Sequence, residues 1–146
     1  MKLAMPPIHP APPAPDPLRM LLVDDCRINR MLVTSMLMRW GIVPTIACNG
    51  EQAVFIAKRR DFDIVLMDMQ MPVMDGVVAT AKIRCSERQR AQLRHMPIVA
   101  YSSLDLAAEQ ENLARIGLDA VLAKPCSPQA LQDCLAQWCP AKFVLN

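Results

Sequence analysis

Charged residues stand directly after three short apolar runs of this sequence. Asp24 and Asp25 follow the first run, Asp68 follows the second, and Lys124 follows the third. If these three ends meet, the acids need a cation, because two bare carboxylates about 4 Å apart repel by roughly 4 kcal/mol at an effective dielectric constant near 20. Hard oxygen ligands favour magnesium, which keeps several waters and binds phosphate oxygens. With the positive charge of Lys124 beside it, this pattern predicts a pocket that holds a phosphoryl group.

The apolar runs have the length and composition of buried β-strands. Ile64–Met67 is continuous and apolar, which is too short for a buried helix and suits a strand covered on both faces. Pro72 and Gly76 then interrupt regular structure and indicate a loop. Such a strand delivers Asp68 to the carboxyl edge of a parallel sheet, where open α/β sheets bind their ligands. The alternative is that Asp68 only caps the helix after the loop.

Strand and helix patterns alternate five times along the chain. The predicted strands cover about residues 19–24, 43–48, 64–67, 97–101 and 120–123, and the predicted helices about residues 27–40, 51–60, 77–85, 104–116 and 128–138. This alternation predicts a parallel sheet covered on both faces. Right-handed crossovers and a site at the carboxyl edge favour an α/β, flavodoxin-like fold, with five strands in the order 2-1-3-4-5 and five helices.

Helical spacing predicts which side of the first two helices packs on the sheet. In the first helix we expect a mainly apolar side made of Ile28, Met31, Leu32, Ser35, Met36 and Arg39. In the second helix we expect the inward residues to be Ala53, Val54, Ile56 and Ala57. The methionines of the first helix are therefore assigned to the core and its flank, and a protein partner on this side stays open as an alternative.

The composition is that of one soluble domain. The 146 residues are 53% hydrophobic and 21% charged, with a formal net charge of +2. That charge is too small to indicate a nucleic-acid partner, and the basic stretch at 86–96 lacks interleaved aromatic residues, so a solvated helix extension is the favoured interpretation. No apolar run approaches the ~20 residues that span a bilayer. The six cysteines show no metal-ligand spacing and suit small side chains kept reduced in a cytoplasmic protein.

Proline density marks the start of the chain. Seven of the thirteen prolines lie in residues 1–18, which we expect to be a disordered tail, with a proline-rich docking peptide as the alternative. We expect one domain over residues 19–140 and a short C-terminal tail over residues 141–146.

Four motifs together resemble the receiver domains of two-component response regulators, whose fold is CheY-like. The motifs are LLVDD (Leu21–Asp25), IVLMDMQMPVMDG (Ile64–Gly76), PIVAYSS (Pro97–Ser103) and LAKP (Leu122–Pro125). The match covers about residues 19–138. Asn29 and the QMPVMDG loop are most similar to the receivers attached to hybrid sensor kinases.

The resemblance implies a role for each acid of the pocket. Asp68 is expected to accept a phosphoryl group from the phosphohistidine of a histidine kinase or a histidine-phosphotransfer protein. Asp25 would bind Mg²⁺ directly, Asp24 would bind it through water or by hydrogen bonds, and Asp68 and the backbone carbonyl of Gln70 would be further ligands. The domain would be no enzyme in the ordinary sense, since it would only assist its own phosphorylation and dephosphorylation.

Three further positions carry over from the family. Lys124 would pair with Asp68 at rest and with the phosphoryl oxygens afterwards. Ser102 matches the hydroxyl residue that swings toward the phosphoryl group, and Pro125 matches a cis-proline. No membrane partner is expected, and the oligomeric state stays open.

Three positions depart from the common pattern of the family, and one of them is Ser103, which replaces a usual alanine. Val121 stands where receivers usually carry Tyr or Phe, the aromatic residue coupled to the switch hydroxyl. Tyr101 cannot replace that ring, because adjacent residues of a strand point to opposite faces. Cys26 follows the acidic pair where a polar residue is frequent, and the neighbouring carboxylates argue against a reactive thiol.

Other function classes fit the sequence less well. A phosphohydrolase of the haloacid dehalogenase type would place a second Asp two residues after its nucleophile as general acid, but this position is Gln70. A flavodoxin would need a loop rich in Ser, Thr and Gly after the first strand. An interaction module of the same fold that works without phosphorylation is the remaining alternative.

Overall fold

The computed structural model describes residue 4 and residues 16–90, 95–103 and 110–143. Five parallel strands form one sheet in the order β2-β1-β3-β4-β5. The strands are β1 (Met20–Val23), β2 (Thr45–Ala47), β3 (Ile64–Asp68), β4 (Ile98–Ser102) and β5 (Ala120–Ala123). The helices are α1 (Arg27–Met38), α2 (Gly50–Ala57), α3 (Gly76–Gln89), α4 (Gln110–Ile116) and α5 (Pro128–Trp138). The predicted fold and strand order are confirmed.

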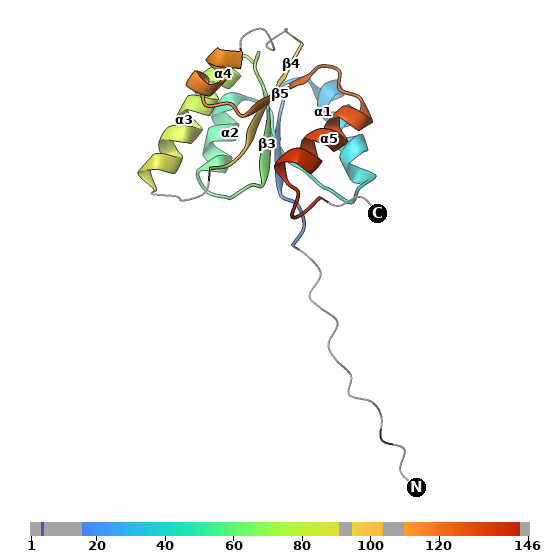
Figure 1. Cartoon of the computed structure of the whole chain (residues 1–146). Helices are drawn as coiled ribbons and strands as arrows, with labels where there is room; N and C mark the ends of the chain where they lie inside the picture. The colour runs from blue at the N-terminus through green and yellow to red at the C-terminus, as the bar shows by residue number, and fades with distance from the viewer. Residues whose placement is uncertain (1–3, 5–15, 91–94, 104–109, 144–146) are drawn as a thin grey trace.

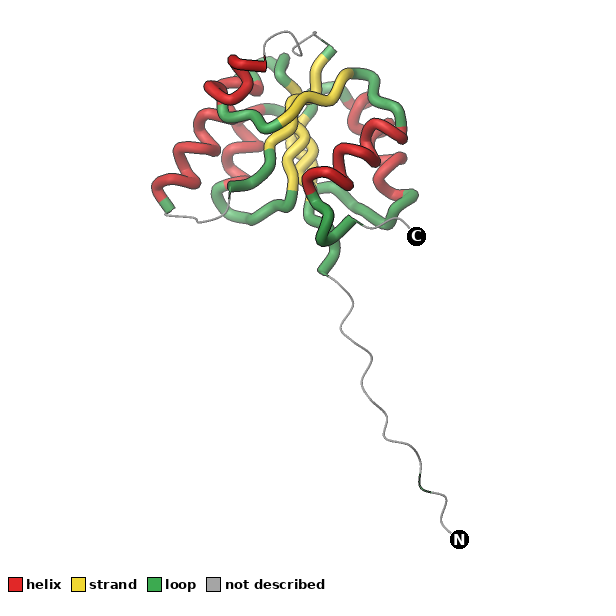
Figure 2. Tube along the Cα trace, viewed as in Figure 1, coloured by secondary structure: helices red, strands yellow, loops and turns green. Residues whose placement is uncertain are grey.

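Helices cover both faces of the sheet (Figures 1 and 2). On one face, α2, α3 and α4 enclose an apolar cluster that includes Val65 and Met67 of β3. On the other face, α1 and α5 enclose a second cluster that includes Ile64 and Leu66 of the same strand. Every residue of β1, β3 and β4 is buried, which explains why these strands read as unbroken apolar runs.

The prediction for the packed side of α1 is wrong for all of its residues except Met36, which is partly buried and packs against the core. Ile28, Met31 and Leu32 are 68%, 57% and 50% exposed, whereas Val33 and Leu37 are completely buried against the sheet. Apolar residues surround most of this helix, so that their spacing alone did not determine which stripe would face inward. In α2 the prediction is confirmed. Ala53, Val54 and Ala57 are buried, and Ile56 packs against the same apolar cluster.

Other element boundaries differ from expectation by a few residues. β2 covers Thr45–Ala47 and not residues 43–48, and α2 covers Gly50–Ala57 and not residues 51–60. The third helix continues to Gln89, into the stretch that we interpreted as a helix extension. The fourth helix was expected from residue 104, but residues 104–109 lie outside the described part of the chain. The predicted tail over residues 1–18 also lies mostly outside it. Among the described residues, no helix combines the length and apolar character needed to cross a bilayer.

Asp63 joins the two ends of the described domain. Its carboxylate accepts a hydrogen bond from the backbone N–H of Arg19 at 2.8 Å and one from Lys142 Nζ at 3.1 Å. The ring of Phe143 is buried and meets that of Trp40 edge-on, with centroids 5.5 Å apart. The packed structure therefore continues to Phe143, beyond the residue 140 at which we expected the domain to end.

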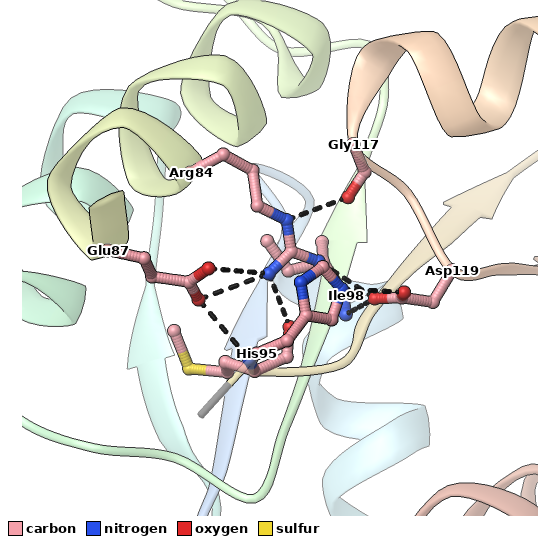
Figure 3. A network of polar contacts seen from close by, with 7 residues as sticks. Arg84, Glu87, His95, Ile98, Gly117 and Asp119 are labelled. Atoms are coloured by element: carbon pink, nitrogen blue, oxygen red, sulfur yellow. Dashed lines mark hydrogen bonds and ion pairs between the residues drawn. The ribbon is translucent and has the colours of Figure 1, made fainter. Parts of the chain in front are cut away.

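A buried arginine ties three segments together at the amino edge of the sheet (Figure 3). Arg84 of α3 donates hydrogen bonds to the Glu87 carboxylate at 3.0 and 3.1 Å and to the Asp119 carboxylate at 2.8 Å. It also donates to the carbonyl oxygens of Met96 at 2.7 Å and Gly117 at 2.9 Å. One side chain thus joins the end of α3 to the segments that lead into β4 and β5.

The two acids of this network also hold the backbone. Glu87 accepts a hydrogen bond from the N–H of Met96 at 3.2 Å, and Asp119 accepts one from the N–H of Ile98 at 2.8 Å. His95 Nε2 lies 2.8 Å from the other oxygen of Asp119. These bonds fix where β4 begins, and hence where its carboxyl end lies relative to β3 and β5.

Candidate functional site

The acids predicted to meet do lie together at the carboxyl edge of the sheet. One carboxylate oxygen each from Asp24, Asp25 and Asp68 lies within 4.8 Å of the others. Asp24 and Asp68 are buried, whereas Asp25 is exposed. The three carboxylates supply hard oxygen donors close enough to share one divalent cation, so this set fits Mg²⁺.

Strand alternation explains why these side chains share one face. Residues two apart in a strand point to the same side of the sheet. Three leucines of the cluster under α1 and α5 each stand two positions before a charged residue of the site, in the pairs Leu22 and Asp24, Leu66 and Asp68, and Leu122 and Lys124. The site is therefore the polar continuation of this apolar layer.

Lys124 bridges the two buried acids. Its Nζ lies 3.0 Å from Asp24 Oδ2 and 3.0 Å from Asp68 Oδ1. Burial by itself would lower the pKa of Lys124, but its hydrogen bonds to Asp68 and Asp24 outweigh burial and raise that pKa above its usual value. Lys124 is therefore a fixed positive charge beside Asp68 at neutral pH.

The surroundings of Asp68 disfavour its ionised form and raise its pKa. Burial raises its pKa from 3.8 to about 6, and the negative charge of Asp24 adds to this effect. The N–H of Gln70, which donates to Asp68 Oδ1 at 3.1 Å, and the ammonium of Lys124 oppose the shift. A further cation beside Asp68 would favour its ionised form, which is the form able to act as a nucleophile.

The raised pKa of Asp68 predicts a pH dependence of stability in the metal-free protein. Because the folded state keeps this proton to higher pH than the unfolded state, the contribution of Asp68 to stability falls as pH rises from about 4 to about 6, and it levels off above that window. Urea unfolding in the presence of EDTA, compared between wild type and Asp68→Asn, isolates this contribution. The variant should gain stability relative to wild type across the window, and parallel curves would contradict the assignment.

Backbone contacts set the position of Asp24. Its Oδ1 accepts a hydrogen bond from the N–H of Cys26 at 2.8 Å, and its carbonyl oxygen accepts one from Arg30 Nη1 at 2.8 Å. Sequence reasoning missed Arg30. The available signal was its place one helical turn after Cys26, on the side of α1 that faces the strand end. Cys26 serves this site through its backbone, which any residue other than proline can provide.

Ser102 ends β4, and Val121 and Tyr101 lie on opposite faces of the sheet. Ser102 is buried at the end of β4, and its carbonyl oxygen accepts the backbone N–H of Lys124 at 2.9 Å. Val121 packs against the cluster under α2, α3 and α4, whereas Tyr101 belongs to the opposite cluster, as alternation predicts. The peptide bond between Lys124 and Pro125 is cis, as expected from the resemblance.

The loop after β3 approaches the site through a glycine. A Cβ at Gly76 would overlap the carbonyl oxygen of Asp68 and lie 2.9 Å from Met69 Cα. Asp75 caps α3 by accepting a hydrogen bond from the N–H of Val78 at 2.9 Å. The loop can therefore return to α3 without displacing Asp68 only because residue 76 has no side chain.

Comparison with known proteins decides the family. The sequence model of the response regulator receiver domain matches residues 20–136, which is most of the chain. The chain belongs to this family. Among its relatives, the sensor protein GacS of Pseudomonas syringae pv. syringae is 39% identical over 120 residues. The alignment covers 82% of this receiver but only 13% of GacS, so the receiver spans a small part of that relative's length.

Solved structures agree with this family. The receiver domain of the sensor histidine kinase PA1611 from Pseudomonas aeruginosa PAO1 is 36% identical, with a TM-score of 0.73 over 84% of this receiver and 97% of that chain. That structure has a magnesium ion coordinated in its active-site cleft. The co-crystal structure of the Saccharomyces cerevisiae histidine phosphotransfer protein Ypd1 with the receiver domain of Ssk1 gives 27% identity and a TM-score of 0.77, over 89% and 94% of the two chains. The phosphohydrolase and flavodoxin alternatives are not favoured.

Proposed function

We propose that this receiver takes a phosphoryl group from a phosphohistidine donor onto Asp68, in a Mg²⁺-dependent step of a two-component phosphorelay. The observation that carries the proposal is the placement of Lys124 Nζ 3.0 Å from both Asp24 and Asp68, which together with Asp25 can share a cation. A positive charge beside a buried carboxylate and a cation site is the arrangement that phosphoryl transfer requires.

Each residue then has a defined part in the transfer. An oxygen of the Asp68 carboxylate forms a bond to phosphorus while the bond from phosphorus to the donor's imidazole nitrogen breaks. That nitrogen keeps the electron pair of the broken bond, and the product is an acyl phosphate on Asp68. Lys124 compensates the charge of the phosphoryl oxygens, and Asp24 holds Lys124 in place. When bound by Asp24, Asp25, Asp68 and the carbonyl of Gln70, Mg²⁺ would neutralise charge on the transferring group.

The relatives support the metal and the class of donor. Magnesium binds in the active-site cleft of the PA1611 receiver, and Ypd1, the protein crystallised with the Ssk1 receiver, is a histidine phosphotransfer protein. The donor of the present receiver is accordingly a histidine kinase or a histidine-phosphotransfer protein. All six cysteines are free, which supports a reducing, cytoplasmic location. The receiver acts on no separate substrate, and it assists only its own phosphorylation and dephosphorylation.

The proposal is tested by transfer from a phosphorylated histidine-phosphotransfer protein to the purified receiver. We expect label to move to the receiver within minutes in Mg²⁺ and to stay on the donor in excess EDTA. Profiling each donor of the host organism would then identify the cognate partner. Transfer that proceeds equally with and without a divalent cation would contradict the proposed mechanism.

Neutralising Asp25 should weaken the cation site without unfolding the domain. Asp25 is exposed, and Asp25→Asn removes one hard ligand, so we expect Mg²⁺ affinity to fall by roughly tenfold or more, with a matching rise in the Mg²⁺ concentration needed for phosphorylation by acetyl phosphate. The measurement is a Mg²⁺ titration of the phosphorylation rate. The matched control is Asp133→Asn, a change at an exposed position of α5, which should leave the titration unchanged. Identical titrations for Asp25→Asn and wild type would exclude Asp25 as a ligand.

A further inference from the structure

Lys124 reaches its partners by crossing an entire strand. β5 and β3 are separated by β4 in the sheet, and neighbouring strands lie about 4.8 Å apart. Lys124 follows β5, yet its Nζ lies 3.0 Å from Asp68 Oδ1 at the end of β3 and 3.0 Å from Asp24 Oδ2 beyond β1. Its side chain must therefore lie over whichever residue β4 presents on this face.

That residue is Tyr101. It pairs with Asp68 on one side and with Leu122 on the other, and Lys124 stands two positions after Leu122 on the same face. Lys124 Nζ lies 4.9 Å from the centroid of the Tyr101 ring, within the range in which an ammonium is attracted to an aromatic face. The ring is 3% exposed, so this attraction acts with little screening by water.

The ring is packed within the core beneath Lys124. Cys126, which follows Pro125, is buried in the same cluster as Tyr101 and lies close to its hydroxyl. Burial, reinforced by Cys126, raises the pKa of Tyr101 above its ordinary value, so the phenol stays neutral and protonated. Tyr101 thus contacts the segment around Pro125 on both sides, at the ammonium of Lys124 and at Cys126.

We propose that Tyr101 is a positioning residue whose ring face holds the Lys124 ammonium between Asp24 and Asp68. A lysine side chain has many rotamers, and ordering one across a neighbouring strand costs conformational entropy. The ring offsets that cost before the phosphoryl group arrives, so the positive charge is already in place at the moment of transfer. This inference rests on the proposed phosphoryl transfer to Asp68 and adds a residue to its machinery.

The test compares Tyr101→Leu, which removes the ring, with Tyr101→Phe, which removes only the hydroxyl. A proton held over an aromatic face is shifted upfield, so the ε-methylene signals of Lys124 in an NMR spectrum report the contact directly. We expect these signals to be upfield in wild type and Tyr101→Phe, and to return to ordinary lysine values in Tyr101→Leu. Ordinary values in wild type would overturn the proposal, whether or not the receiver is phosphorylated.

The second readout is the rate of phosphorylation by acetyl phosphate in saturating Mg²⁺. We expect Tyr101→Leu to be roughly 5- to 30-fold slower than wild type and Tyr101→Phe to stay within about twofold. The Mg²⁺ affinity of Tyr101→Leu should not fall, whereas general disruption of the site would lower affinity and rate together. Val99→Ala, a core truncation on the same strand and face, should leave the rate unchanged.

The outcomes separate the two proposals. A wild-type protein that fails to incorporate phosphate contradicts the proposed function, while the NMR result still judges the contact between the ring and Lys124. A wild-type protein that is phosphorylated at the same rate as Tyr101→Leu overturns the positioning role. An equal loss in Tyr101→Phe and Tyr101→Leu also overturns it, because the hydroxyl and not the ring face would then be responsible.

Discussion

Asp68→Asn should reduce phosphoryl incorporation to background. An amide is not a nucleophile toward phosphorus, and Asp68 is the acid that meets the Lys124 ammonium at 3.0 Å while accepting the N–H of Gln70. The expected result is a protein that folds, keeps the ion pair between Lys124 and Asp24, and carries no acyl phosphate after incubation with acetyl phosphate and Mg²⁺. Intact mass, and peptide mapping after trapping of the acyl phosphate, measure this directly.

Two other carboxylates near Asp68 could accept the phosphoryl group in its place, so the test distinguishes between acceptors. Asp24 and Asp25 each have a carboxylate oxygen within 4.8 Å of one on Asp68, so that two alternative acceptors lie near it. Asp133→Asn serves as the control for a change of one charge and should incorporate phosphate as wild type does. A mass increase of one phosphoryl group that persists in Asp68→Asn would show that a different carboxylate is the acceptor.

Arg84→Met should cost about 3–5 kcal/mol of folding free energy, the range for breaking a buried ion pair by removing one partner. The substitution conserves bulk but removes the arginine that pairs with both Glu87 and Asp119, whose side chains are 11% and 16% exposed. It also removes the donors to the carbonyl oxygens of Met96 and Gly117. Urea unfolding monitored by far-UV circular dichroism gives the free energy from the midpoint and slope.

Two comparisons isolate the cause. Lys82→Met, on the exposed side of the same helix, should change stability by less than about 0.5 kcal/mol. Adding Glu87→Gln to Arg84→Met should recover part of the loss, because one uncompensated buried charge is removed. If Arg84→Met and Lys82→Met unfold at the same urea concentration, the charges of the Arg84 network contribute nothing to the free energy of unfolding.

The fold could be predicted because its signals are local. A strand buried on both faces must be apolar throughout, and the runs at β1 and β3 satisfy this without interruption. The site followed from the same local signals, since a parallel sheet brings all carboxyl ends to one edge. Asp24, Asp25, Asp68 and Lys124 could therefore be grouped before any coordinates were known.

The features that sequence reasoning missed depend on contacts between distant residues. Arg84 binds residues 3, 12, 33 and 35 positions away, and nothing near it in the sequence distinguishes it from the exposed arginines that follow. The buried stripe of α1 depends on how the helix lies across the sheet, because Ile28, Leu32 and Val33 are equally apolar. The place of Tyr101 beneath Lys124 needs strand order and side-chain direction together, and neither is sufficient alone.

The carboxylate of Asp63, which binds both Arg19 and Lys142, also determines where further segments of a longer protein can join the receiver. Arg19 and Lys142 both bind Asp63, which stands just before β3, so both ends of the packed domain lie at the sheet edge opposite Asp68. Any segment joined to either end leaves from that edge. Neither attachment point therefore stands between Asp68 and a donor that docks at the opposite, phosphoacceptor edge.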